Sequence, residues 1–555
     1  MFHSSSFLEC AKGISLILAH ITACIIDIDN PEASLTVAIC SDHRLHGAAT
    51  MAEAACGFVL PFYEPLQLLQ TKPYDFTQLG KQHANSPTSA ATAAALAAYV
   101  RPDFLAELSF HRGALSAWLQ QQATTSGSSS GSGGGGFGAG GTAAAVVPEG
   151  VLEGLAALAA RLHGLTYALA GPAAASMAAP AGSTAAEGLP YGEGGGNGGR
   201  GGGAAIAAAA AVTAGMLRTE WTSALSSKPQ RMLKLDSLPQ ELAMVYTTTA
   251  AAMRQAAHQR LEDSLASATS ISAFGTAAGD TGTAASTASA PASPGTATAA
   301  DNSSSGTTAA AAAGALTSAV ASLRRAAGLY GYLADEMLPE LGTGAGAGGE
   351  RPLELLPPAA RLMQLLCLAE GQALMAAAAE ARGMAPGTQR ALHAGCLTLL
   401  RQAEAAAAAL AAASPPSLPP ASRLPRLLGV SCGLHEGRCL LARAAELQRD
   451  MQLGEAEAAC EECMRVLGGA ARRLERSDPP AWGEAIKAQQ ARCAPLLAAV
   501  HKDRLAVTYQ PLPKQPPDAT ANAAVRVTPE PFRPVPVAPP LPPPDQGAKP
   551  GCALM

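Results

Sequence analysis

The sequence predicts an all-α protein, built mainly of long helices in one elongated domain. Apolar residues recur three and four positions apart over Leu316–Leu333, with Arg324 and Arg325 on the opposite side, which is the pattern of a helix with one buried face. Only 4% of the residues are aromatic, so the core must rest on leucine and alanine. The 56 glycines and 41 prolines among 555 residues favour one large domain with disordered inserts over several compact domains.

The first 65 residues are predicted to be an N-terminal extension of unknown role. Ile14–Ile26 is apolar, but His20 interrupts it and it is too short for a comfortable membrane span. It could be the core of a targeting segment, since Lys12 precedes it, or part of an untargeted extension or of an incorrect start. The sequence leaves these alternatives open, and the domain is expected to span residues 66–535.

Helical periodicity continues along that domain. It is found over residues 103–122, 151–170, 238–265, 358–381, 388–412, 427–447, 454–474 and 482–500. Trp118 is expected to be a large core anchor, and Ser237 can cap the helix that follows it, with Glu241 near the first turn. Helices joined by breaks as short as Gly383–Gly387 form an antiparallel bundle or a helical solenoid.

Three low-complexity tracts interrupt the helices. They are rich in Gly and Ser, or in Ala, Thr and Ser, and bury too little apolar surface to offset the entropy of the chain. We expect disordered inserts at residues 126–141, 192–203 and 267–308. After them, 436–447 and 454–467 have small residues where two helices would cross, which is typical of a tetratricopeptide-like hairpin.

No group of residues points to catalysis, a cofactor or a metal. The 11 histidines are scattered, and none lies in an H-E-x-x-H pattern. Cys460 and Cys463 have the spacing of metal ligands but lie within a helical pattern, so we interpret them as core thiols. The net charge of −5 disfavours nucleic-acid partners, and the 12 dispersed cysteines favour a reducing, cytosolic compartment. We therefore expect a protein that is not an enzyme.

Several stretches resemble, in order, the central helices of the Bro domain, the ALIX-like fold of endosomal-sorting adaptors. They are Arg325–Leu333, Leu365–Ala373 and Val430–Ala456. Leu66–Leu79 resembles the short β-like opening of that domain, and Ala521–Val525 with Pro529–Phe532 resembles the closing arm that folds back over the helices. The closest likeness is to the short, BROX-like members of the family, which end in a prenylated tail.

The resemblance implies a partner and a groove. Bro domains bind the C-terminal amphipathic helix of an ESCRT-III subunit of the charged multivesicular body protein class. Carried over residue by residue, the groove is expected at Met375, Thr388, Leu392 and Val525. Thr388 departs from the large aliphatic residue that is usual in the family, which puts the affinity in doubt, though not the mode of binding.

The chain ends in a Pro-rich tail, residues 536–555, that carries Cys552-Ala-Leu-Met555. This is a C-a-a-X box of the form typical of farnesyl transfer, and its alternative is an unmodified tail with a free thiol. The predicted protein is thus a non-enzymatic, prenylated adaptor in the cytoplasm, peripherally bound to endosomal membranes by a farnesyl group on Cys552. The alternative function is a prenylated tetratricopeptide-like scaffold that binds another partner, such as a small GTPase or a chaperone.

Overall fold

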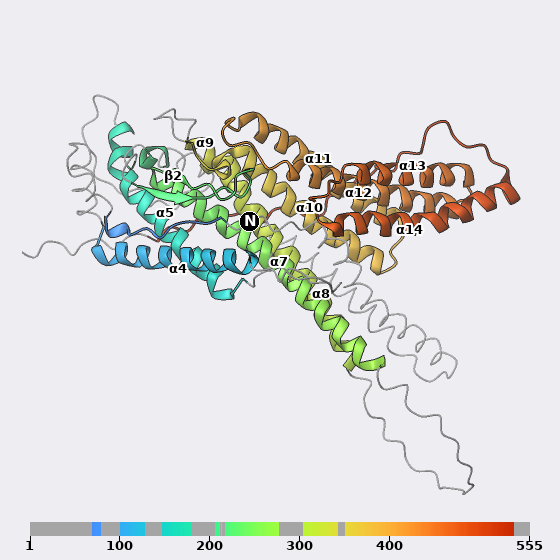
Figure 1. Ribbon diagram of the computed structural model, residues 1–555, viewed down its shortest axis with the longest axis horizontal. Coiled ribbons are helices and arrows are strands. Elements are labelled where there is room, and N and C mark those ends of the chain that lie inside the picture. The colour runs from blue at the N-terminus through green and yellow to red at the C-terminus, as the bar shows by residue number, and fades with distance from the viewer. Residues whose placement is uncertain are drawn as a thin grey trace, which may run out of the picture.

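The computed structural model describes residues 69–78, 100–127, 147–178, 206–210, 213, 217–276, 304–341 and 350–537. Within these ranges the protein is an elongated stack of helices, with α4 and α5 at one end and α12 to α14 at the other (Figure 1). The predicted mainly helical class is confirmed. The helices are α4 (Pro102–Gly127), α5 (Glu149–Ala178), α7 (Leu238–Thr276), α8 (Ser304–Tyr332), α9 (Leu338–Glu340), α10 (Pro357–Ala381), α11 (Pro386–Ala413), α12 (Arg423–Arg449), α13 (Leu453–Arg472) and α14 (Pro480–Asp503).

Two of the predicted inserts are shorter than expected where the structure describes their ends. Helix α7 continues to Thr276 and α8 begins at Ser304, so both ends of the tract 267–308 are helical. Helix α4 likewise reaches Gly127, inside the predicted insert 126–141. Once a helix has formed, adding residues to its end costs little free energy. Composition alone therefore misplaces the boundary between a helix and a low-complexity insert. The tract 192–203, residues 1–65 and the tail 538–555 lie outside the described residues.

A small β-hairpin lies between the first helices and α7. Strands β1 (Thr219–Trp221) and β2 (Leu233–Leu235) pair antiparallel, with Trp221 opposite Leu233. Thr71 bridges to Trp221, so the opening segment of the domain adds to this hairpin as the β-like pattern predicted. The hairpin itself was not predicted, because its strands are only three residues long and carry no clear alternation.

A buried ion pair joins this hairpin to the helices. Arg112 Nε donates to Glu241 Oε1 over 2.6 Å, and both side chains are completely buried. Trp221 Nε1 and Thr219 Oγ1 donate to the other carboxylate oxygen over 2.6 and 2.7 Å. Glu241 lies in the first turn of α7, as predicted, and points into the core, where it accepts hydrogen bonds from three buried donors of distant segments.

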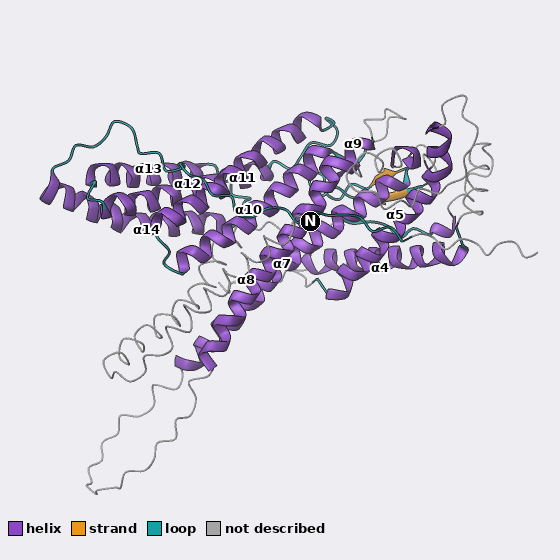
Figure 2. Cartoon of the chain, turned by 180° about the vertical axis from the view of Figure 1, so that it is seen from behind, coloured by secondary structure: helices purple, strands orange, loops and turns teal. Residues whose placement is uncertain are grey.

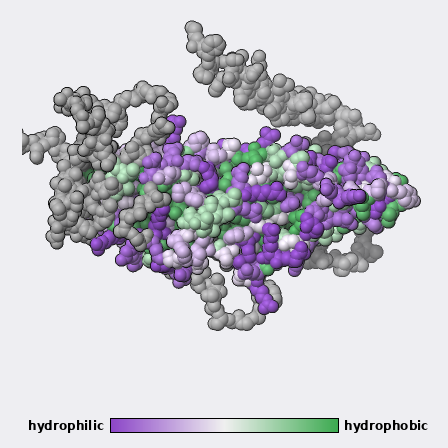
Figure 3. Space-filling view, turned by 90° about the horizontal axis from the view of Figure 1, so that it is seen from above, coloured by the Kyte–Doolittle hydropathy of each residue, from purple (hydrophilic) through white to green (hydrophobic). Residues whose placement is uncertain are grey.

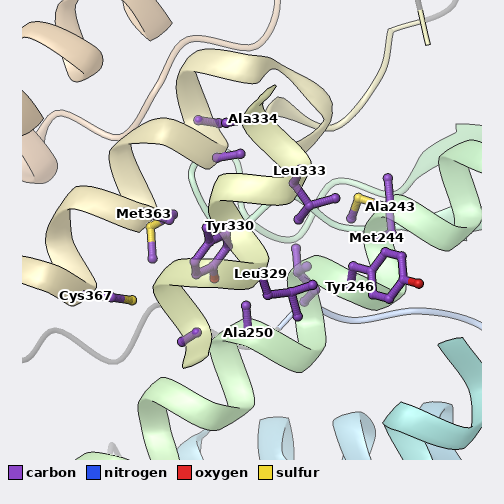
Figure 4. Close-up of a cluster of buried hydrophobic side chains, with 14 of the residues drawn as sticks. Ala243, Met244, Tyr246, Ala250, Leu329, Tyr330, Leu333, Ala334, Met363 and Cys367 are labelled. Atoms are coloured by element: carbon purple, nitrogen blue, oxygen red, sulfur yellow. The ribbon is translucent and has the colours of Figure 1, made fainter. Parts of the chain in front are cut away.

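The core between α7, α8 and α10 is closely packed. Ala243 and Ala250 of α7 are buried beside Leu329 and Tyr330 of α8 and Leu333, the residue after α8, as Figure 4 shows. Small residues let helices approach while leucine and tyrosine fill the space between them. Trp118 is buried, as predicted.

Helices α12 and α13 form the predicted hairpin, with glycines at their crossing. A Cβ at Gly433 would lie 2.8 Å from that of Ala470, so only glycine permits this approach. Cys460 and Cys463 are fully buried in this second core, which confirms their interpretation as core thiols.

Among the described helices, α10 and α11 are long and apolar enough to span a membrane, by length and composition alone. In this fold, 89% of the most apolar window of α10 and 44% of that of α11 is buried inside the protein.

The closing arm, residues 519–537, crosses the helices in an extended conformation. Figure 2, which views the molecule from behind, shows loop segments crossing the stack of helices. The arm makes backbone hydrogen bonds to α11, α8 and α5 in turn: Ala524 N donates to Ala391 O, Glu530 N to Arg324 O and Val537 N to Ala160 O. A segment bonded to helices that are far apart in the sequence fixes them in one arrangement. The predicted closing arm is confirmed in this respect.

Candidate partner-binding site

One buried glutamine of α10 holds the closing arm. Gln372 is fully buried, and its Nε2 donates to Leu392 O on α11 over 3.1 Å and to Ala524 O over 2.9 Å. Its Oε1 accepts from the backbone N–H groups of Arg526 and Val527 over 2.9 and 3.3 Å. An amide has two donors and an acceptor oxygen with two lone pairs, so this side chain is satisfied by α11 and the arm together.

Glycines on the helices make room for the arm. A Cβ at Gly395 of α11 would lie 2.3 Å from Ala524 O, and one at Gly328 of α8 would lie 1.7 Å from Glu530 O. Any larger residue at either position would push the arm away. The arm therefore lies directly on the helix backbones rather than on a layer of side chains.

An aromatic cluster anchors the far part of the arm. The ring of Phe532 lies 5.4 Å from those of Tyr246 and Tyr332, in edge-to-face and tilted arrangements. Such pairs stabilise beyond the area that they bury. The phenolic oxygen of Tyr246 lies 2.7 Å from His163 Nδ1, and burial lowers the pKa of His163 to about 4, so this imidazole is neutral near pH 7.

The four predicted groove residues lie on the three segments that Gln372 joins, which are α10, α11 and the arm. Gln372 contacts both Leu392 and the arm, Met375 lies one turn along α10, and Thr388 lies one turn before Leu392 on α11. Val525 follows the residue that bonds to Ala391. We call these residues the arm surface. The resemblance to Bro domains indicated all four, but nothing in the sequence indicated Gln372 or the glycines that position the arm.

The four residues differ in exposure. Thr388 is exposed and Val525 is 41% exposed, whereas Met375 is half-buried. Leu392 is only 8% exposed and packs with Ala376 and Ala379. A partner on this surface would therefore touch Val525, Thr388 and Met375, with Leu392 as support beneath them.

A buried polar network that the sequence did not indicate joins α10, α11 and α12. His393 Nε2 lies 2.7 Å from Glu380 Oε1, and His393 Nδ1 lies 3.1 Å from His435 Nδ1. Burial lowers the pKa of both imidazoles. Because the Glu380 carboxylate can only accept, neutral His393 donates from Nε2, and His435 then donates from Nδ1 to His393. Nothing in the spacing of these residues signals the network, because their contacts are non-local.

Arginines complete the surroundings of Glu380. Arg438 Nη1 and Arg492 Nη1 donate to its two oxygens over 3.2 and 3.1 Å. Burial alone would raise the pKa of Glu380, but the bond from His393 and the two guanidinium groups hold this pKa well below its usual range. The carboxylate is charged at any physiological pH. Within the described residues, no group of three or more His, Cys, Asp or Glu side chains is arranged to hold a metal ion.

Three solved structures are similar to this chain. ALIX in complex with the SIVmac239 PYKEVTEDL late domain is 14% identical with a TM-score of 0.49, and the match covers 84% of this chain and 48% of that one. The complex of the ALIX BRO1 domain with CHMP4C is 14% identical with a TM-score of 0.46, covering 84% and 94%. A structure on endosomal targeting by the Bro1 domain is 10% identical with a TM-score of 0.47, covering 83% and 90%.

The chain thus spans about half the length of the ALIX chain in the first of these structures. No family model matches the sequence, and no curated protein matches it. Cys552 lies outside the described residues.

Proposed function

We propose that this protein is a non-enzymatic adaptor of the ESCRT pathway with a Bro-like domain, and that its arm surface binds the C-terminal amphipathic helix of an ESCRT-III subunit. The observation that carries the proposal is the position of the closing arm. Gln372 bonds to Ala524 and Arg526, the residues on either side of Val525, and Ala524 N bonds to Ala391 O of α11. This supports a surface in which Met375, Thr388 and Val525 contact the partner and Leu392 lies beneath them. These are the residues that the resemblance to Bro domains assigned to partner binding.

The chemistry of this surface suits one face of an amphipathic helix. A helix docks by burying aliphatic side chains spaced three and four apart. Val525 and Met375 offer apolar contact area, and full burial of such a side chain contributes roughly 1.5–3 kcal/mol. Thr388 adds a hydroxyl in place of an aliphatic side chain, so the expected affinity is modest. ALIX forms its named complex with CHMP4C; the proposal for this chain rests on its own residues.

A lipid anchor is the second part of the proposal. A farnesyl group on Cys552 would bring the adaptor from the cytoplasm to endosomal membranes. One lipid chain gives only marginal, reversible membrane binding, so a second contact is needed for stable residence. A polymer of ESCRT-III subunits at the membrane supplies that contact in many copies and raises the effective concentration of the partner.

The test compares two valines of the same arm. Val525 lies in the proposed surface, whereas Val535 is 74% exposed and lies ten residues further along, beyond Phe532. We expect Val525→Asp to weaken binding of a labelled ESCRT-III C-terminal helix by roughly ten-fold or more. Val535→Asp should leave the affinity unchanged. Leu392→Asp is unsuitable, because at 8% exposure the new charge would be buried and would destabilise the fold.

Fluorescence anisotropy of the labelled helix measures both affinities, and circular dichroism checks that both variants are folded. Equal binding by wild type and Val525→Asp would show that the arm surface is not the site. A folded protein that does not bind the helix at all would favour the alternative, a prenylated scaffold for another partner.

A further inference from the structure

A cleft of about 320 Å³ opens where the connection between α10 and α11 meets α12 and α14. Its walls are α12 and α14, and its end is the connection between α10 and α11. None of the four arm-surface residues lines it. The lining residues are Glu380, Pro386, Gln389, Arg438, Leu441, Ala442, Ala445, Arg492 and Leu496.

One end of the cleft is polar and carries more positive than negative charge. Glu380 lies between Arg438 and Arg492, while its third partner, His393, is neutral. The two arginines differ: the Arg438 side chain is 10% exposed and lies deep in the cleft, whereas that of Arg492 is 52% exposed. Burial lowers the pKa of Arg438 to about 9, so one carboxylate does not fully offset the cost of burying its charge.

The neighbouring ion pairs do not remove this excess. Glu446, on the next turns of α12, accepts from both Arg390 and Arg443. Two guanidinium groups therefore again share one carboxylate. Charge complementarity favours an anionic group at this end of the cleft.

The other end of the cleft is apolar. On α12, Leu441, Ala442 and Ala445 follow Arg438 at positions three, four and seven residues later, so they lie on the same helix face. On α14, Leu496 follows Arg492 by one turn. Both walls thus change from guanidinium to aliphatic within one helical turn, about 6 Å. Figure 3 shows one face of the molecule as a whole, on which hydrophilic and apolar residues are interspersed.

We propose that this cleft is a second binding site, for a peptide segment of a partner protein that carries a carboxylate and an aliphatic side chain about one helical turn apart. The carboxylate lies between Arg492 and Arg438, and the aliphatic side chain lies against Leu441 and Leu496. A simple anion would leave the apolar half of the cleft unused, and a purely apolar segment would leave the excess charge uncompensated. This site is independent of the arm surface.

The test uses alanine-based helical peptides labelled with fluorescein. One peptide carries Glu and Leu four residues apart; one control has Gln in place of Glu, and another has Ala in place of Leu. We expect saturable binding of the Glu/Leu peptide to the full chain with a Kd below about 1 mM, and binding roughly ten-fold weaker for each control peptide.

Protein variants locate the binding. Arg492→Gln removes the half-exposed charge and should weaken binding of the Glu/Leu peptide roughly ten-fold, but should not change binding of the Gln control peptide. Lys487→Gln makes the same charge change at an exposed position of α14 outside the cleft, and should have no effect. Ala445→Met narrows the apolar end and should weaken binding without removing any charge.

Three results would overturn the proposal. The Glu/Leu peptide could show no saturable binding up to about 1 mM. The Glu and Gln peptides could bind with the same affinity, or Lys487→Gln could lower the affinity for the Glu/Leu peptide as much as Arg492→Gln does. Circular dichroism and urea unfolding of each variant exclude misfolding as the cause of a loss.

Discussion

Replacing Gln372 with methionine should release the closing arm while the helices stay folded. Methionine has nearly the same shape but forms none of the hydrogen bonds that Gln372 makes to Leu392, Ala524, Arg526 and Val527. Two backbone N–H groups of the arm would lose their acceptor, and that of Val527 is buried. Each such bond contributes about 0.5–1.5 kcal/mol net, and each buried group left unpaired costs about 1–3 kcal/mol.

The expected loss for the arm is therefore roughly 2–5 kcal/mol. Hydrogen exchange followed by mass spectrometry measures it directly. Because every 1.4 kcal/mol corresponds to a factor of ten, peptides covering residues 521–530 should exchange at least roughly thirty times faster in Gln372→Met. Exchange in the middle of α10 and α12 should not change.

The matched control is Gln402→Met, which makes the same substitution at an exposed position of α11. Unchanged exchange of the arm in Gln372→Met would refute the reasoning, since it would mean that Phe532 and the backbone bonds hold the arm without the glutamine. Uniformly faster exchange over all helices would also contradict the prediction, because it would show that the arm does not open separately from the rest of the domain.

Three further predictions concern stability and membrane binding. Glu241→Ala should lower the free energy of unfolding in urea by about 3–5 kcal/mol, because it leaves Arg112 buried without its carboxylate; a loss below 1 kcal/mol would contradict the buried pair. The folded pKa of His163, about 4, lies below the unfolded value of 6.5, so the unfolded state binds more protons between these values and stability falls as the pH drops through that window. His163→Phe should reduce this pH slope by up to about 1.4 kcal/mol per pH unit in urea titrations at several pH values, and an unchanged slope would mean that the imidazole is not neutral in the fold. Cys552→Ser and Val525→Asp should each lower the membrane-bound fraction in sedimented cell extract, and the double variant should add little; a Cys552→Ser protein that sediments like wild type would exclude the lipid anchor.

The helices were predictable because their signals are local. The predicted stretch 358–381 is α10 to within one residue, and Leu238 is the first residue of α7, as predicted. Apolar periodicity and the breaks at proline and glycine lie within each segment, so no knowledge of the rest of the chain is needed.

The contacts that position the site were not predictable, because their partners are far apart in the sequence. The sequence places Glu241 near the first turn of α7, and only the fold shows that Arg112, Trp221 and Thr219 bind it. The resemblance assigned Leu392 to the groove but could not show that this side chain is covered by Ala376 and Ala379. The register of the arm is set by Gln372, which has no sequence signal that separates it from any other glutamine in a helix.

In the proposed function, the closing arm and the α10–α11 hairpin together form the surface that binds a partner helix. Hydrogen exchange with and without a saturating ESCRT-III C-terminal helix is the decisive measurement for that surface. We predict added protection of the arm around Val525 and of the first turns of α11 around Thr388, with no change at Arg438 and Arg492 in the cleft. Protection confined to α12 and α14, or none in the arm, would contradict the claim.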